Sequence, residues 1–166
     1  MDKEIVYGFA ESKFGTIVVA RTASGICDLQ FLGYNKMEVI HELASHWGVY
    51  TPTTQDDMMA DTVKRIIFDG YDHEIYIDLH GTEFQLKVWK EVMKVQKGET
   101  ISYQELAERI GEPKAVRAVA TAVAQNSIAM LVPCHRIIHK DGTLGEYHWG
   151  RELKKEILDW EKNTDA

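Results

Sequence analysis

The sequence predicts an α/β protein made of two small domains, an α/β unit followed by a mostly helical unit. Short β-rich runs separated by glycine-containing turns fill the start of the chain. Two helix-start signals of the form Ser/Thr-x-x-Glu/Gln then open the second half. At 166 residues, the chain is long enough for each unit to enclose a core. We place the domains at residues 1–78 and 79–166.

The first domain is predicted to contain three strands and two helices. The strands are Ile5–Ala10, Thr16–Ala20 and Ile26–Leu32. Apolar residues at helical spacing predict helices over Met37–Trp47 and Asp57–Phe68, and Glu74–Leu79 is expected to be extended. Cys27 lies in an apolar run and is expected to be a core residue. No combination of residues in this half indicates catalysis.

The second domain begins with the capping box Thr82–Gln85, and the helix that follows is expected to end at Lys97-Gly98. A second capping box at Ser102–Glu105 predicts a short helix through Arg109. A third helix is expected over Pro113–Ala124, with the proline as its first residue. The last helix is expected over Arg151–Glu161.

The second and third of these helices form a helix-turn-helix pattern joined at Gly111-Glu112-Pro113. The third helix carries mostly small residues and one long cation, Arg117. A helix that reads bases in the major groove usually offers several polar side chains. This helix therefore fits either close approach to a groove with little sequence reading, or packing in the core.

The two halves of the sequence differ in net charge. The net charge is −7, and residues 1–80 hold 6 basic and 13 acidic residues. Residues 81–166 hold 13 of each, and residues 113–155 hold seven basic against three acidic residues. The locally basic stretch indicates either a nucleic-acid surface or an ordinary mixed surface. No apolar run is long enough to span a membrane, and the start Met1–Glu4 lacks the basic-then-apolar pattern of a signal peptide, so none is expected. With two distant cysteines, a reducing cytoplasm is expected.

The stretch with the clearest chemistry is Pro133-Cys134-His135-Arg136, flanked by apolar residues. A thiol becomes a good nucleophile when a base, a cation or a helix N-terminus lies nearby. His135 could supply the base, although an isolated Cys-His pair is more often an inert buried cysteine.

Five segments together resemble the O6-alkylguanine-DNA alkyltransferases, or methylated-DNA–protein-cysteine methyltransferases, of the bacterial type. They are Ile101–Ala107, Pro113–Val119, Asn126, Pro133–Arg136 and Gly145–Tyr147. The resemblance implies a ribonuclease-H-like first domain and a winged-helix-like second domain. It also implies DNA repair in which one alkyl group moves irreversibly from O6-alkylguanine, or O4-alkylthymine, to the protein's own cysteine.

The resemblance assigns roles to individual residues. Cys134 is the acceptor, His135 deprotonates it through a water, and Glu161 orients His135. Tyr103 donates to guanine N3, and Asn126 bonds the turn before the active-site loop. The resemblance also implies a finger that fills the duplex (Arg117) and a substrate pocket (Val132, Ile137, Tyr147, His148). Because such a protein must bind any sequence, four cations are candidates for phosphate contacts, each with a solvated surface or structural role as its alternative (Lys114, Arg136, Lys140, Arg151). Arg136 has bracing of the active-site loop as its alternative role.

The implied partner is double-stranded DNA, bound through the minor groove by a monomer that flips the damaged nucleotide out of the stack. No cofactor and no metal are expected, because the cysteines and histidines of the animal zinc site are missing. The bulk of His148-Trp149 would disfavour large alkyl groups.

Four alternatives remain open. A damage sensor without repair would lack Cys134, and a helix-turn-helix regulator would carry base-reading side chains. A metal site built from Cys134, His135 and His139 would need side chains that converge. The side chains of His135 and His139 diverge if this segment is extended. A cysteine hydrolase needs an oxyanion hole, which we cannot identify in the sequence.

Overall fold

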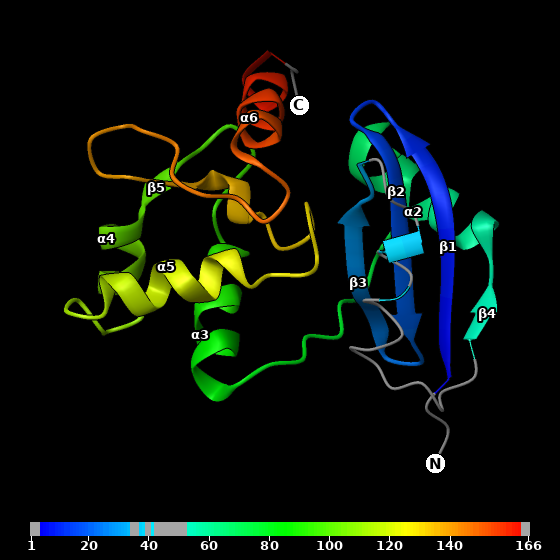
Figure 1. Ribbon diagram of the computed structural model, residues 1–166, viewed down its shortest axis with the longest axis horizontal. Helices are drawn as coiled ribbons and strands as arrows, with labels where there is room; N and C mark the ends of the chain where they lie inside the picture. The colour runs from blue at the N-terminus through cyan, green and yellow to red at the C-terminus, as the bar shows by residue number, and fades with distance from the viewer. Residues whose placement is uncertain (1–3, 34–36, 39–40, 42–52, 164–166) are drawn as a thin grey trace. The chain divides into compact units, whose positions relative to one another are not determined.

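The structure is a computed structural model that describes residues 4–33, 37, 38, 41 and 53–163 (Figure 1). The chain separates into two compact units, Met1–Leu79 and His80–Ala166. This division lies one residue from the boundary predicted from the sequence. The architecture is α/β, as predicted, with a sheet and a helix in the first unit and mostly helices in the second.

The first unit is built on a four-stranded sheet with strand order β3-β2-β1-β4. Its strands are β1 (Ile5–Ser12), β2 (Gly15–Thr22), β3 (Gly25–Phe31) and β4 (Thr53–Gln55). The first three form antiparallel hairpins, as the glycine turns predicted, whereas β4 pairs with β1 in parallel. Strand β4 was not predicted, because its three polar residues lack the alternation of apolar and polar residues that marks a strand.

Helix α2 (Asp57–Phe68) has the bounds that its apolar spacing predicted. Its N-terminus is capped by Asp56, whose side chain accepts a hydrogen bond from the Met59 amide. The corner before α2 lies so close to β1 that a Cβ on Gly8 would sit 2.1 Å from the Asp56 carbonyl oxygen. Glycine is required there for steric reasons. The predicted helix over Met37–Trp47 lies largely outside the described residues.

The segment predicted to be extended after α2 runs beside β3. Ile77 forms an isolated parallel bridge with Ile26, whose amide and carbonyl both bond this segment at 2.8 Å. Cys27 is 2% exposed and packs with Ile5 and Ala20, so the prediction of a core cysteine is confirmed.

The second unit packs four helices around a short parallel sheet. The helices are α3 (Glu83–Val92), α4 (Tyr103–Arg109), α5 (Val116–Ala124) and α6 (Arg151–Asn163). The sheet pairs β5 (Ile101–Ser102) with β6 (Ile137–Ile138), and a 3₁₀ turn, η1 (Cys134–Arg136), leads into β6. The pairing places Ile101, two residues before α4, beside Ile137, the residue that follows the Cys-His-Arg turn.

The capping box of α3 is present in both directions between Thr82 and Gln85, as predicted. The predicted end at Lys97-Gly98 was wrong, because α3 stops at Val92. The chain turns there through Val95, whose side chain is 1% exposed and whose carbonyl accepts a hydrogen bond from Arg136. Burial of Val95 and this long-range bond outweigh the local helix preference.

Helix α5 begins at Val116, three residues after the predicted start at Pro113. A turn closed by the Ala115 amide on the Glu112 carbonyl occupies the intervening residues. Helix α4 and helix α5 pack together in the predicted helix-turn-helix order (Figure 1). The indole of Trp89 in α3 donates to the Ala122 carbonyl at 2.9 Å and ties α5 to the core.

Candidate functional site

The peptide before Cys134 forms an inverse γ-turn. Pro133 has φ −79° and ψ 63°, and the Cys134 amide donates to the Val132 carbonyl at 2.7 Å. Proline suits this turn, since its ring holds φ near the required value. The turn leads directly into η1, and Cys134 is 2% exposed.

The side chain of Asn126 stabilises this turn through hydrogen bonds to the backbone. Its side-chain amide donates to the Val132 carbonyl at 3.0 Å and to the Ile128 carbonyl at 3.3 Å. Its carbonyl oxygen accepts from the Ile128 amide at 2.9 Å. These bonds fit the predicted role of Asn126 as the residue that shapes the turn after α5.

Cys134 is protonated at neutral pH. Burial raises the pKa of its thiol to about 12, while the charge of Lys154 and a hydrogen bond from Asn126 act in the opposite direction. A thiol with such a pKa is almost entirely neutral at pH 7. Any reaction of this sulfur as a nucleophile therefore needs a base that removes its proton.

His135 is fully buried next to the cysteine. Burial lowers the pKa of its imidazole, although contact with Glu161 works against that shift. The ring is therefore neutral and able to accept a proton at neutral pH. Its Nε2 lies 3.0 Å from Oε1 of Glu161, but an Nε2 proton does not point along a hydrogen-bond direction. This close contact between Nε2 and the carboxylate favours the tautomer with its proton on Nε2.

Glu161 is held by a bidentate ion pair with Arg136. The Arg136 Nε donates to Oε1 at 3.0 Å, Nη2 donates to Oε2, and Nη1 donates to the Val95 carbonyl at 2.8 Å. The Arg136 side chain is 13% exposed. These contacts are those of a residue that braces the active-site loop, and the phosphate contact of Arg136 stays a prediction.

The contacts of Glu161 with Arg136 and His135 stabilise the charged form of its carboxyl group. Burial alone would raise the pKa of the carboxyl, but its contacts with His135 and Arg136 lower it from 4.5 to about 2. Glu161 is therefore ionised throughout the neutral range and faces His135 as a buried negative charge.

Lys154 is a site residue that the sequence analysis missed. Its side chain is completely buried, and Nζ donates to the carbonyls of Ile137 (2.6 Å), Leu144 and Glu146 (3.2 Å). Nζ also lies 3.3 Å from the hydroxyl of Tyr103. Burial lowers the pKa of the ammonium to about 8, while Cys134 and Glu146 raise it.

A signal for Lys154 was present in the spacing of helix α6. Four residues of α6 are buried: Lys154, Ile157, Leu158 and Glu161. Their i, i+3, i+4, i+7 spacing marks the inward face of an amphipathic helix. A charged residue at such a position is rarely buried without a partner. Both charged members of this face reach the neighbourhood of Cys134.

Tyr103 is the first residue of α4 and is 5% exposed. Burial raises the pKa of its phenol to about 12, with smaller contributions from Cys134 and Glu146, so the hydroxyl remains a donor. The ring of His139 lies 5.0 Å from the Tyr103 ring. The backbone of Gly145 lies close to both side chains, because a Cβ there would come within 2.8 Å of the Tyr103 hydroxyl and 3.0 Å of His139 Nε2.

The remaining pocket candidates differ in burial. Val132 and Ile137 are fully buried on either side of Cys134. Tyr147 is 8% exposed, and its ring lies edge-on to His135 at 6.4 Å. His148 is exposed and stacks on Trp149 at 4.4 Å. The structure thus brings Cys134 together with a buried base, a buried acid, a buried cation and two phenols.

Comparisons with known proteins match both units to one family. Residues 5–67 match the family described as "6-O-methylguanine DNA methyltransferase, ribonuclease-like domain". Residues 83–163 match "6-O-methylguanine DNA methyltransferase, DNA binding domain". The chain belongs to the 6-O-methylguanine DNA methyltransferase family. The ribonuclease-like first domain implied by the sequence resemblance is thereby confirmed, as is the DNA-binding character of the second domain's family.

Relatives within the 6-O-methylguanine DNA methyltransferase family cover most of the chain. A methylated-DNA–protein-cysteine methyltransferase of Methanosarcina barkeri is 34% identical over 95% of this chain and 98% of the relative. The one from Kluyveromyces lactis is 48% identical over 72% of this chain and 70% of the relative. The Ada protein of Escherichia coli is 38% identical over 92% of this chain, which spans only 44% of Ada's length.

Solved structures of the family agree with this fold. The O6-methylguanine methyltransferase of Mycobacterium tuberculosis has a TM-score of 0.78 at 33% identity, over 98% of this chain and 95% of that chain. A second structure from that organism, of OGT in complex with DNA, has a TM-score of 0.76 at 31% identity, over 95% of this chain and 92% of that chain.

The cations predicted to contact DNA lie on the surface of the family's DNA-binding domain. Arg117 on α5 and Lys114 in the turn before it are both exposed, as is Lys140. Arg151 is exposed and pairs with Glu146 at 2.9 Å. The structure does not test their contacts with phosphate, which stay predictions.

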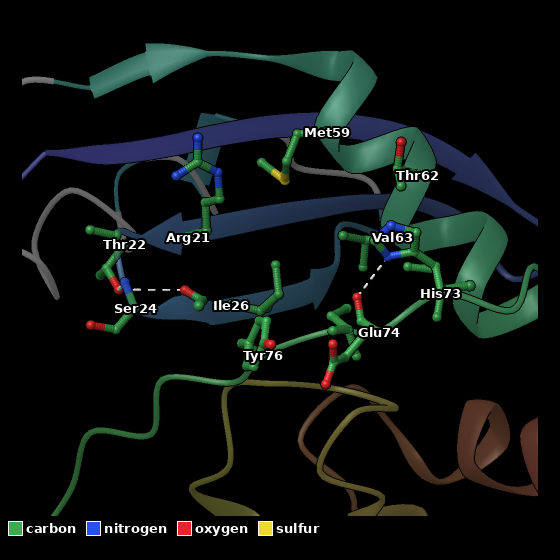
Figure 2. A pocket seen from close by; sticks show the side chains of 14 residues that line it. Arg21, Thr22, Ser24, Ile26, Met59, Thr62, Val63, His73, Glu74 and Tyr76 are labelled. Atoms are coloured by element: carbon green, nitrogen blue, oxygen red, sulfur yellow. Dashed lines mark hydrogen bonds between the residues drawn. The ribbon is translucent and has the colours of Figure 1, made fainter.

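A pocket of about 390 Å³ lies in the first unit, and none of the predicted site residues lines it (Figure 2). Residues from the β2–β3 turn, from α2 and from the segment 73–76 line it, including Arg21, Met59 and His73. In the described part of the chain, no group of three or more potential metal ligands converges. Among the described helices, none combines the length and apolarity that a bilayer crossing requires.

Proposed function

We propose that this protein repairs alkylated DNA by transferring the alkyl group of O6-alkylguanine to Cys134, once per molecule. One observation carries the proposal. A buried cysteine that is protonated at rest adjoins a buried neutral histidine, which contacts an ionised glutamate. Membership of the 6-O-methylguanine DNA methyltransferase family supports the substrate class.

The reaction follows from these groups. His135 takes the thiol proton, and the Cys134 sulfur attacks the alkyl carbon in line with the bond to guanine O6. A carbon–sulfur bond forms as the carbon–oxygen bond breaks, and the electron pair stays on the guanine. The guanine anion takes up a proton from water at N1 and remains in the DNA as the normal base. Glu161 stabilises the imidazolium that forms, and Arg136 keeps Glu161 in place.

Two further donors act on the departing base. Tyr103 donates its hydroxyl proton toward guanine N3 while negative charge develops on the ring. Its raised pKa keeps the phenol neutral for this task. Lys154 places a positive charge near the sulfur and fixes the carbonyls of Ile137 and Glu146 beside the pocket. The product is a neutral thioether, and regaining the thiol would require another nucleophile to attack its stable carbon–sulfur bond, so the transfer is irreversible.

The DNA partner is double-stranded, and the damaged nucleotide leaves the stack because O6 is out of reach inside the duplex. We place α5 in the minor groove, where its small residues permit close approach and the exposed Arg117 fills the space of the flipped nucleotide. The protein acts as a monomer on any sequence, through phosphate contacts from exposed cations such as Lys114. A reducing compartment such as the cytoplasm keeps the acceptor thiol available.

The test is intact-mass measurement after incubation with a duplex that contains one O6-methylguanine. We expect one added methyl group per protein, mapped to the peptide that contains Cys134. Cys27 is the internal control, because it is equally buried and burial raises the pKa of its thiol as well. Cys134→Ala should stay unmodified while still binding the duplex. Methylation at Cys27, or a modified Cys134→Ala protein, would refute the assignment.

The same experiment separates repair from damage sensing. A sensor would bind O6-methylguanine DNA and leave its methyl group in place, so the wild-type mass would not change. Cys134 argues for repair, because a sensor has no need for a buried thiol beside a base.

A further inference from the structure

His139 is an exposed histidine at the edge of the site, and the transfer step described above does not use it. Its ring lies against the ring of the buried Tyr103, with centroids 5.0 Å apart and an interplanar angle of 47°. Both side chains approach the backbone of Gly145, where a Cβ would lie 2.8 Å from the Tyr103 hydroxyl and 3.0 Å from Nε2 of His139. The hydroxyl and Nε2 therefore face the same short piece of backbone.

The turn that carries His139 is held by its own hydrogen bonds. The His139 amide donates to the Thr143 carbonyl at 2.8 Å, and the Gly142 amide donates to the His139 carbonyl at 3.0 Å. The carboxylate of Asp141 accepts from the Thr143 amide at 3.0 Å and from the Thr143 hydroxyl at 2.7 Å. His139 thus extends from a backbone of defined shape, which lowers the entropy cost of a contact made at this place.

The structure of guanine indicates which part of a bound nucleotide His139 would meet. In the six-membered ring of guanine, N3 lies directly across from C6, the carbon that carries O6. N3 is also next to C4, which is bonded to N9, and N9 carries the deoxyribose. The Tyr103 hydroxyl, which we assign to N3, therefore marks the sugar side of the base, whereas Cys134 marks the O6 side. A side chain placed beside Tyr103 at Gly145 is directed toward the deoxyribose and its phosphates.

The cations near His139 suit a phosphate ligand. Lys140 is the next residue in the chain and is exposed. The buried ammonium of Lys154 lies 5.6 Å from the centroid of the Tyr103 ring, the same ring that His139 contacts. A phosphate at Nε2 would therefore meet a positive local field, which favours a charged hydrogen bond.

The acids around His139 are already engaged by other groups. Hydrogen bonds from Thr143 lower the pKa of Asp141, and the charge of His139 lowers it further. The carboxylate of Glu146 pairs with Arg151 at 2.9 Å. In the described part of the chain, no carboxylate forms an ion pair with the His139 ring. The ring is therefore open to an anion supplied from outside the protein.

We propose that His139 binds a backbone phosphate of the flipped nucleotide, as an imidazolium that donates a hydrogen bond from Nε2. This inference rests on the proposed function, because it uses the position that Tyr103 gives to the base. Histidine changes its charge between about pH 5 and 8, and a phosphate stabilises the protonated form. Binding of flipped DNA is then linked to uptake of a proton, so affinity is higher at low pH and falls as the imidazolium of the complex loses its proton.

The test compares duplex affinity with and without His139. Affinity for a duplex with one O6-methylguanine is measured in Cys134→Ala, which binds without transfer, and in the same protein with His139→Gln added. Between about pH 8 and pH 6, we expect affinity to rise about fivefold more in the protein that keeps His139. An equal rise in both proteins would overturn the proposal.

A neutral phosphate analogue identifies the group that His139 meets. A methylphosphonate is placed at either phosphate that flanks the damaged nucleotide. At one of these positions, it should remove the difference in pH dependence between the two proteins, because the residue and the phosphate form one contact. A methylphosphonate several nucleotides away should leave the difference in place. If the difference persists with both flanking phosphates neutral, His139 does not bind there.

Two matched variants separate this contact from other charge effects. His73→Gln removes an exposed histidine from the first unit, where its ring bonds the Glu74 carbonyl, and should leave the pH dependence unchanged. Lys140→Gln should weaken binding by the same factor at both pH values, because lysine stays charged throughout this range. If Lys140→Gln removed the pH dependence as fully as His139→Gln, the titrating contact would not belong to His139.

Transfer from free O6-benzylguanine tests whether His139 only packs against Tyr103. The free base has no phosphate, so His139→Gln should lower the single-turnover rate on it by less than about twofold while weakening binding to the duplex. A loss on the free base as large as the loss on the duplex would make His139 a packing residue and overturn the proposal. If the wild type transfers no alkyl group from either substrate, the proposed function fails instead.

Discussion

The ammonium of Lys154 in α6 lies 2.6 Å from the carbonyl oxygen of Ile137 in β6, two buried groups 17 residues apart in the chain. The same ammonium bonds the carbonyls of Leu144 and Glu146 and approaches the Tyr103 hydroxyl. One side chain thus connects the strand after the nucleophile, the loop after that strand and the first turn of α4. No local sequence pattern could have specified this connection.

Replacing Lys154 should disable the site. We expect Lys154→Met to slow alkyl transfer by about a hundredfold or more, roughly 2.7 kcal/mol of barrier. The substitution removes the charge near Cys134 and leaves the buried carbonyl of Ile137 and the part-buried carbonyls of Leu144 and Glu146 without their donor. Single-turnover kinetics on O6-methylguanine duplex measure the effect. The matched control is Lys155→Met, since the Lys155 side chain is 69% exposed and bonds only Asp159. Equal rates in both variants would mean that the contacts of Lys154 are not used.

Glu161→Gln should slow transfer by roughly ten- to a thousandfold, about 1.4 to 4 kcal/mol of barrier. The amide keeps the shape of the carboxylate but loses the charge that stabilises protonated His135. Binding to duplex DNA should change little, because Glu161 is buried and offers no surface to a phosphate. Rates and a binding titration should be measured together. Glu152→Gln on the exposed face of α6 is the control, and a normal rate in Glu161→Gln would remove the acid from the mechanism.

The free energy of unfolding should depend on pH through Glu161. Its folded pKa of about 2 lies below the ordinary value of 4.5, so the folded protein binds the proton less tightly than the unfolded chain. The resulting stabilisation is fully present above about pH 4.5 and is lost as pH falls toward 2. It amounts to about 3 kcal/mol. Chemical denaturation at several pH values should show a shallower slope in this window for Glu161→Gln. An unchanged slope would contradict the depressed pKa.

Gly145→Ala should damage the pocket through a clash as well as through the backbone. Gly145 has a φ of +75°, and a Cβ would lie 2.8 Å from the Tyr103 hydroxyl and 3.0 Å from Nε2 of His139. We expect a transfer rate lowered about tenfold or more, because Tyr103 must move. Gly142→Ala is the control with the same kind of backbone cost, since its φ is +90° and nothing lies near its Cβ. If both variants lose stability and only Gly145→Ala loses rate, the clash is responsible.

Arg117→Ala should impair transfer from duplex DNA much more than transfer from free O6-benzylguanine. The exposed arginine is assigned to the flipped state, and a free base needs no flipping. We expect a loss of about tenfold or more on the duplex and less than about twofold on the free base. Arg109→Ala removes the same charge from α4, where Arg109 pairs with Glu105, and should show neither loss. Equal losses on both substrates would make Arg117 a structural residue.

The sequence by itself determined the elements whose signals are local. Helix α2 follows its apolar spacing and the Asp56 cap, the capping box of Thr82 begins α3, and the first three strands follow their glycine turns. The pairing of Cys134 with His135 is also local, because the two residues are adjacent. The order of the short motifs was enough to indicate the family.

Only the tertiary structure decided the features that depend on distant contacts. Helix α3 ends early because Val95 is buried and its carbonyl serves Arg136, and β4 exists because β1 offers it a free edge. The Arg136 side chain points inward and pairs with Glu161, and the buried Lys154 ammonium bonds the Ile137 carbonyl. A backbone or side-chain polar group is buried favourably only when it has a hydrogen-bonding or charged partner. In these cases the partner comes from a residue distant in the sequence, so tertiary packing determines which residue it is.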